Sequence, residues 1–109
     1  MMVALIAIYK APENKSEFDS HYKEIHSPLS AKMEGLRRLE IARVSKMLTP
    51  PTSTIAETPY LMCTMYFDDQ TALDTSMRSP SGKAAARDLM GFAGPLVSMV
   101  TAEVEEIAL

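Results

Sequence analysis

The sequence has little of what several specialised protein classes depend on. Its 109 residues include one cysteine, four glycines and no tryptophan. The single thiol of Cys63 cannot close a disulfide within the chain, and no Cys-x-x-Cys pair or Cys/His spacing predicts a structural metal. No Gly-rich phosphate loop, nucleophile elbow or dinucleotide fingerprint is present either. We therefore expect a protein of the reducing cytoplasm that has no integral cofactor.

Excess positive charge and long apolar runs are absent as well. Eleven basic residues stand against fourteen acidic ones, which gives a net charge of −3. That sign opposes binding to a phosphate backbone. The apolar run Met2–Ile8 is too short to span a bilayer. Neither a nucleic acid nor a membrane is expected as a partner.

The composition is that of an ordinary folded protein. Hydrophobic residues make up 47% of the chain and charged residues 23%, and this length suits one domain spanning residues 1–109. The segments Met2–Lys10 and Pro59–Phe67 are apolar on both faces, which predicts central strands. The segments Leu36–Met47 and Leu96–Ile107 alternate with polar residues, which predicts strands nearer the edge.

Capping residues predict where the first helix begins and breaks. Asn14 followed by Glu17 is typical of a helix N-terminus. Pro28 disfavours the helical conformation of Ser27, so we expect a break or a kink there, with Ser27 capping a second short segment. His26 would then lie at the C-terminal end of the first segment, where the helix dipole favours a protonated imidazole.

The second half of the chain shows similar signals. Leu48–Pro59 is rich in proline, serine and threonine and predicts a long loop, either a lid or a dimer contact. Asp68–Asp69 is expected to cap a short helix. Ser79–Pro80 is expected to start another, which Gly91 and Gly94–Pro95 would end.

This order of elements predicts an α+β fold of the ferredoxin-like, split β-α-β type. A four-stranded antiparallel sheet would carry its helices on one face, with the first and third strands in the centre. Because those two strands are apolar on both sides, something must cover the opposite face. We expect a homodimer in which two sheets pack face to face.

Several motifs in this order resemble the EthD family of dimeric α+β barrel proteins, and the likeness covers nearly the whole chain. They are Tyr9-Lys10-x-Pro12, Phe18-x-x-His21-Tyr22-x-x-x-His26-Ser27-Pro28-Leu29, Gly35-Leu36-Arg37-Arg38, Tyr66-Phe67-Asp68-Asp69 and Ser79-Pro80-Ser81-Gly82-Lys83-Ala84-Ala85-Ala86. The family is named for ethyl tert-butyl ether degradation. Related barrels include cofactor-free lactone isomerases, small monooxygenases and proteins of polyketide or pigment synthesis. Leu39 departs from this pattern, because many relatives carry a tyrosine there and a polar pocket contact is lost.

His26 is the main candidate for catalysis. Imidazole exchanges protons near neutral pH, and the predicted helix break places this ring beside a core face. The alternative is a histidine that only caps the helix end. Tyr22, one helical turn earlier, is expected either to contact the same substrate or to pack in a stripe with Phe18 and Ile25. His21 would lie about 140° away from His26 on a regular helix, so a shared metal is not expected.

Three other side chains are weaker candidates for contact with a substrate. Tyr9 and Tyr66 lie near the ends of the central strands, where their hydroxyls would reach a cavity mouth or only pack. Cys63 has no basic neighbour in sequence, so it is expected to be an inert thiol that either lines a pocket or fills the core. The nine methionines suit an adaptable apolar pocket, or they fill gaps in the core.

Together these features predict an enzyme that acts on a hydrophobic carbonyl, lactone or aromatic small molecule by proton transfer at His26, without a cofactor. The alternative is a metabolite-binding or oxygenase-accessory protein of the same fold. A haem-dependent oxygenase is a third possibility, for which His26 would be the axial ligand.

Overall fold

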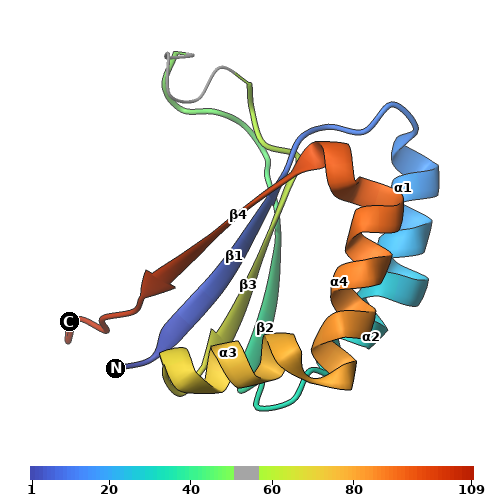
Figure 1. Cartoon of the computed structure of the whole chain (residues 1–109). Helices are drawn as coiled ribbons and strands as arrows, with labels where there is room; N and C mark the ends of the chain where they lie inside the picture. Colours follow the sequence, from blue (N-terminus) through green and yellow to red (C-terminus); the bar gives the residue numbers. More distant parts are fainter. Residues whose placement is uncertain (51–56) are drawn as a thin grey trace.

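The computed structural model describes residues 1–50 and 57–109, so residues 51–56 of the predicted long loop lie outside the described residues. One antiparallel sheet has the strand order β2-β3-β1-β4. Its strands are β1 (Val3–Tyr9), β2 (Arg38–Arg43), β3 (Leu61–Phe67) and β4 (Val97–Glu103). The two most apolar strands, β1 and β3, are central, and the predicted ferredoxin-like fold is confirmed (Figure 1).

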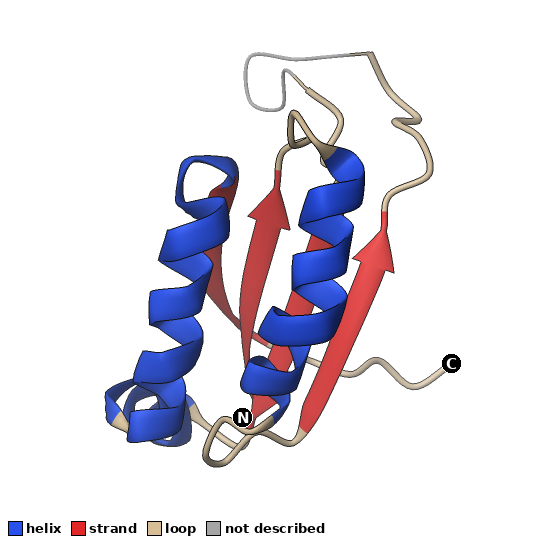
Figure 2. Ribbon diagram, turned by 90° about the vertical axis from the view of Figure 1, so that its right-hand side faces the viewer, coloured by secondary structure: helices blue, strands red, loops and turns tan. Residues whose placement is uncertain are grey.

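All the helices lie on one face of this sheet (Figure 2). A first column contains α1 (Lys15–His21), the π-helical turn η1 (Tyr22–His26) and α2 (Ser27–Ala31). The second half contributes α3 (Gln70–Arg78), α4 (Pro80–Ala93) and the short turn η2 (Gly94–Leu96). The predicted caps are present, since the side chains of Asn14, Asp69 and Ser79 accept hydrogen bonds from the backbone amides of Glu17, Ala72 and Gly82.

Of the predictions for Pro28, a break in the helix and a new N-cap at Ser27 are wrong. Ser27 has helical angles (φ −59°, ψ −43°), and its amide donates to the carbonyl of Tyr22, five residues earlier. Proline removes a donor and crowds the carbonyl four residues before it, and a wider turn at that point accommodates both effects. The helix therefore runs without interruption from Lys15 to Ala31, and His26 lies inside it.

The predicted helix end at Gly94–Pro95 is confirmed, but Gly91 does not contribute to it, because α4 continues to Ala93. Gly91 costs the helix about 1 kcal/mol relative to alanine. Burial of Leu89 and Ala93 on either side of it outweighs that cost. A residue with weak helix propensity on the exposed face of a helix does not end that helix when the opposite face is packed against the core.

The strand register divides the sheet into two faces. The odd-numbered residues of β1 and β3, such as Leu5, Cys63 and Phe67, are buried beneath the helices. On the other face, Ile6, Ile8, Met62 and Tyr66 remain half-buried and Val100 of β4 is 49% exposed. No helix among residues 1–50 and 57–109 covers this second face. No helix in the described part of the chain has the length and apolar character needed to cross a membrane.

Candidate active site

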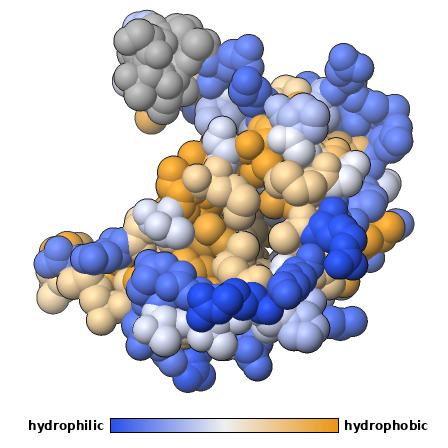
Figure 3. Space-filling view, in the orientation of Figure 1, coloured by the Kyte–Doolittle hydropathy of each residue, from blue (hydrophilic) through white to orange (hydrophobic). Residues whose placement is uncertain are grey.

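An apolar pocket of about 250 Å³ lies between the helical layer and the sheet. It is visible as a hollow between β4 and α4, with apolar side chains around it (Figure 3). Among its twelve lining residues, only His26 and Ser30 have polar side chains. The apolar wall consists of Leu5, Met33, Met65, Met77, Gly82, Ala85, Ala86, Leu89, Met90 and Met99. A polar group of a ligand bound here would meet one imidazole and one hydroxyl.

The contacts of His26 define its tautomer. Nδ1 lies 3.0 Å from Oδ2 of Asp88 in α4, and Nε2 lies 3.4 Å from the Ser30 hydroxyl. A carboxylate only accepts hydrogen bonds, so Nδ1 must donate the proton. In the neutral ring Nε2 is then unprotonated and accepts from Ser30. The arrangement leaves a basic nitrogen on the side where Ser30 and the pocket lie.

The π-helical turn determines which residues face the sheet and α4. A regular α-helix predicts Ile25 on the buried stripe, but Ile25 is 47% exposed while His26 is buried. The wider turn shifts the phase of the helix, and it also cancels the predicted 140° separation of the two histidines. His21 Nε2 lies 2.9 and 3.1 Å from the two oxygens of Asp88. Both imidazoles therefore meet one carboxylate.

The predicted preference of His26 for its protonated form is also wrong. Burial lowers the pKa of His26 below its ordinary value, and the hydrogen bond to Asp88 and the charge of its carboxylate offset this effect only in part. A protonated His21 lowers the pKa of His26 further. The ring lies within the helix, so no helix terminus stabilises its charge. A neutral imidazole is the form that accepts a proton as a general base.

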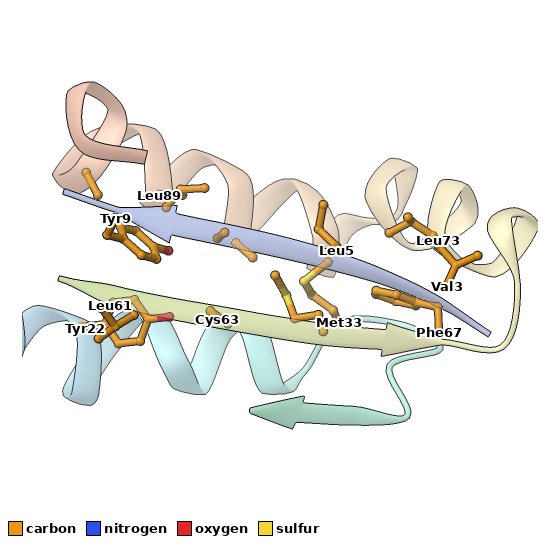
Figure 4. Close-up of a cluster of buried hydrophobic side chains, with 14 of the residues drawn as sticks. Val3, Leu5, Tyr9, Tyr22, Met33, Leu61, Cys63, Phe67, Leu73 and Leu89 are labelled. Carbon is orange, nitrogen blue, oxygen red and sulfur yellow. The ribbon is translucent and has the colours of Figure 1, made fainter. Parts of the chain in front are cut away.

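Tyr22, Tyr9 and Cys63 form a buried group behind His26, and none of them lines the pocket. The Tyr22 ring lies 5.4 Å from the His26 ring and 5.5 Å from that of Tyr9. Figure 4 shows Tyr22 beside Cys63 beneath β3. Burial raises the pKa of both tyrosines and of the Cys63 thiol, so all three remain neutral near pH 7. Cys63 occupies the helix-covered face of the sheet, where it fills the core without lining the pocket.

Tyr66 and Leu39 are placed apart from the pocket. Tyr66 lies on the sheet face without helices, where its hydroxyl donates to Glu40 at 2.7 Å. The expectation that it reaches the mouth of this cavity is therefore wrong. Leu39 is on the helix-covered side of edge strand β2, opposite Met65 in the register, and packs against the core without lining the pocket.

Asp88 is the important residue that the sequence analysis missed. A signal for it exists, because Asp88 follows Ala85 by three residues and precedes Phe92 by four, which places a carboxylate on the apolar stripe of α4. Ser30, one turn after His26, was missed for a similar reason. Each is a polar residue at a position where the helical spacing predicts an apolar one.

A second, open hollow lies on the outer side of the same helices. His21, Asp88 and Phe92 line it together with Ala84, Arg87 and Gly91. Phe92 packs against both imidazoles, with ring centroids 4.3 Å from His21 and 5.1 Å from His26. Within residues 1–50 and 57–109, no three His, Cys, Asp or Glu side chains are arranged to hold a metal ion. Hydrogen bonds hold His21, Asp88 and His26 together in this cluster.

Comparison with known proteins identifies the family. Residues 10–95 match the EthD domain family. The structure of an EthD-family protein from Bacillus halodurans is 41% identical, covers 96% of this chain and 100% of its own, and superposes with a TM-score of 0.85. An uncharacterized 11.0 kDa protein encoded between thcB and thcC of Rhodococcus erythropolis is 26% identical over 97% of this chain and 98% of its own.

Two more distant structures share the fold. A dimeric ferredoxin-like protein of unknown function from Bacteroides fragilis is 20% identical, with a TM-score of 0.61 over 94% of this chain and 96% of its own. SnoaB, a cofactor-independent oxygenase from Streptomyces nogalater, is 12% identical, with a TM-score of 0.67 over 97% of this chain and 95% of its own. These relatives share the ferredoxin-like fold of this chain.

Proposed function

The chain belongs to the EthD family, and from this membership and the geometry of the pocket we propose that it is an enzyme of small-molecule metabolism in which His26 transfers a proton. The family and its structural relatives support the broader statement, a metabolic role toward small molecules. One observation supports the narrower proposal, proton transfer by His26. His26 lines a pocket whose walls are otherwise apolar except for Ser30, and its unprotonated Nε2 faces the Ser30 hydroxyl.

The proposed chemistry is removal of a proton from carbon next to a carbonyl. Nε2 of His26 takes the proton, and the electron pair of the broken C–H bond moves onto the carbonyl oxygen to form an enolate. The Ser30 hydroxyl is released when Nε2 becomes protonated, and it turns to donate to that oxygen. Return of the proton to a different atom completes an isomerisation. Tyr22 holds the imidazole from behind, and no cofactor takes part.

The size of the pocket limits the substrate. A cavity of about 150 Å³ holds one benzene ring, so 250 Å³ suits a ligand of about ten non-hydrogen atoms. Five methionine side chains in the wall offer polarizable contacts to an aromatic ring. We therefore favour single-ring phenols, lactones and β-dicarbonyl compounds over multi-ring substrates.

We extend the proposal to assembly and location. In the described part of the chain, no helix covers the sheet face that carries Ile6, Ile8, Met62 and Val100. The Bacteroides fragilis relative is described as dimeric. Face-to-face packing of two copies would bury these apolar side chains. The absence of a possible disulfide in a chain with one cysteine suits the cytoplasm.

A ligand screen tests the proposed function. Wild type and His26→Gln are heated with single-ring lactones, phenols, quinones and β-dicarbonyl compounds. A ligand at one hundred times its Kd stabilises the fold by about 2.7 kcal/mol, or about 10 °C in Tm for a chain of this length. Each hit is then incubated in D₂O. We expect wild type to exchange or isomerise the ligand and His26→Gln to lose at least 10²-fold in rate; a loss below threefold would exclude the role of His26.

The second candidate is a binding protein without catalysis. The nearly apolar wall of the pocket favours it, because such a wall sequesters a hydrophobic metabolite as readily as it holds a substrate. In this case ligands would raise Tm without any exchange in D₂O. His26→Gln would then alter affinity alone.

A further inference from the structure

His21, Asp88 and His26 form a continuous chain from the outer surface to the inner pocket. The exposed fraction of the side chains falls along it, from 28% for His21 to 17% for Asp88 and 6% for His26. His21 and Asp88 line the outer hollow, whereas His26 lines the pocket. Three titratable groups thus cross the helical layer in hydrogen-bond contact.

The contacts meet at a single atom. Oδ2 of Asp88 lies 3.0 Å from Nδ1 of His26 and 3.1 Å from Nε2 of His21. A proton that arrives on Oδ2 from one imidazole is already within reach of the other, so the carboxyl group need not rotate. The π-helical turn makes this possible by bringing two histidines five residues apart to the same side of the helix.

We propose that Asp88 and His21 conduct protons between the buried His26 imidazole and solvent on the outer side of α4. A hydrophobic ligand in the pocket excludes water from Nε2 of His26, whereas Nδ1 keeps its contact with Asp88. A proton can then leave His26 through the hydrogen bonds of Asp88 and His21 on the outer side. The inference depends on the proposed function for its use in catalysis, but the route itself is a property of the protein without ligand.

Each transfer breaks one bond to hydrogen and forms one. A His26 imidazolium, formed when Nε2 accepts a proton, gives its Nδ1 proton to Oδ2 of Asp88. Asp88 passes it to Nε2 of His21 when His21 is in the tautomer protonated at Nδ1, and His21 releases its Nδ1 proton to water. The partly exposed ring of His21 reaches that tautomer by exchange with water. The reverse sequence delivers a proton to His26, and no electrons are transferred.

Exchange of the His26 Nδ1 proton with water tests the route in the protein without ligand. Protein labelled with ¹⁵N-histidine is used, and the exchange rate is measured from the ring N–H resonance by NMR. The variant His21→Phe keeps an aromatic ring against Phe92 but has no titratable nitrogen. Arg87→Gln, in the same outer hollow and outside the chain of contacts, is the control.

We expect the His26 exchange rate to fall at least tenfold in His21→Phe and to stay within twofold of wild type in Arg87→Gln. In His21→Ala, which leaves space at the outer hollow, dissolved imidazole should restore the rate while leaving wild type unchanged. Equal rates in wild type and both His21 variants would overturn the proposal. This result is separable from the proposed function, because a failed ligand screen with His21-dependent exchange rejects the chemistry and keeps the route.

Discussion

The Nδ1–H group of His26 donates a hydrogen bond of 3.0 Å to the carboxylate of Asp88 on the neighbouring helix α4, and the His26 side chain is 94% buried. The relationship orients the imidazole and determines which nitrogen is available as a base. It also partly offsets the effect of burial on the pKa of His26.

Asp88→Asn is expected to lower the pKa of His26 further, because burial persists while the stabilising charge is lost. The Asn side chain also offers both a donor and an acceptor, so the Nε2-protonated tautomer should gain population. Titration of the ¹⁵N-histidine resonances measures both quantities. His21→Gln is a control with the opposite sign, since His21 lowers the pKa of His26 and its removal should raise that pKa. An unchanged pKa in Asp88→Asn would show that the carboxylate does not interact with the ring in solution.

Stability should fall in mildly acidic solution. Burial places the pKa of His26 in the folded protein below its unfolded value of about 6.5. The unfolded chain therefore binds more protons than the folded one as the pH drops below about 6.5, and the free energy of unfolding decreases until the folded pKa is passed. Urea unfolding between pH 7.5 and 5.5 measures the slope, and His26→Gln should reduce it. The same slope in both proteins would contradict a lowered pKa.

Ala86→Phe should close the pocket. Ala86 lines the pocket, whereas Ala84 lines the outer hollow on the same helix. We expect phenol or benzene to perturb the NMR spectrum of wild type and Ala84→Phe with similar affinity, and to bind Ala86→Phe at least tenfold more weakly. Equal binding to both phenylalanine variants would place the ligand elsewhere.

How much of this arrangement the sequence predicts depends on the distance over which each signal acts. The caps at Asn14 and Ser79 are local hydrogen bonds, and they were predicted correctly. The central position of β1 and β3 follows from their apolar character on both faces. Periodicity assumes a constant helical turn, so it predicts that Ile25 is buried. The π-helical turn rotates the following residues, and His26 is buried instead of Ile25. Asp88 escaped notice because its partners are more than sixty residues away.

Gly82→Ala is expected to destabilise the protein by about 2–3 kcal/mol. A Cβ at Gly82 would lie 1.9 Å from the carbonyl oxygen of Ser76, so α3 and α4 would have to separate. Gly91→Ala in the same helix meets no atom within 4 Å and should stabilise by about 0.5–1 kcal/mol through helix propensity. Chemical denaturation of both variants measures the difference; equal effects would mean that the two helices pack more loosely than described.

Light scattering should give about 24 kDa for wild type, twice the chain mass of 12.0 kDa. Val100→Glu places a charge on the uncovered sheet face and should shift the mass to that of one chain. Thr101→Glu, on the same strand with its side chain toward the helix-covered side, should leave the mass unchanged. A wild-type mass of 12.0 kDa at micromolar concentration would rule out the dimer.

The π-helical turn also makes the chain sensitive to its length at this point. It fits one residue more than an α-helical turn would, so the segment Tyr22–His26 behaves as a single-residue insertion within a helix that otherwise runs regularly from Lys15 to Ala31. Deleting one residue there would restore the regular winding, and each residue of an α-helix turns the chain by about 100°. Relatives with a regular α-helix here would present both imidazoles to the carboxylate of α4 only if three residues, not four, separated the two histidines, because residues i and i+4 share a face of an α-helix. The interval His-x-x-x-x-His, read together with an acidic residue on the apolar stripe of α4, is therefore the spacing expected in chains that combine this cluster with a π-helical turn.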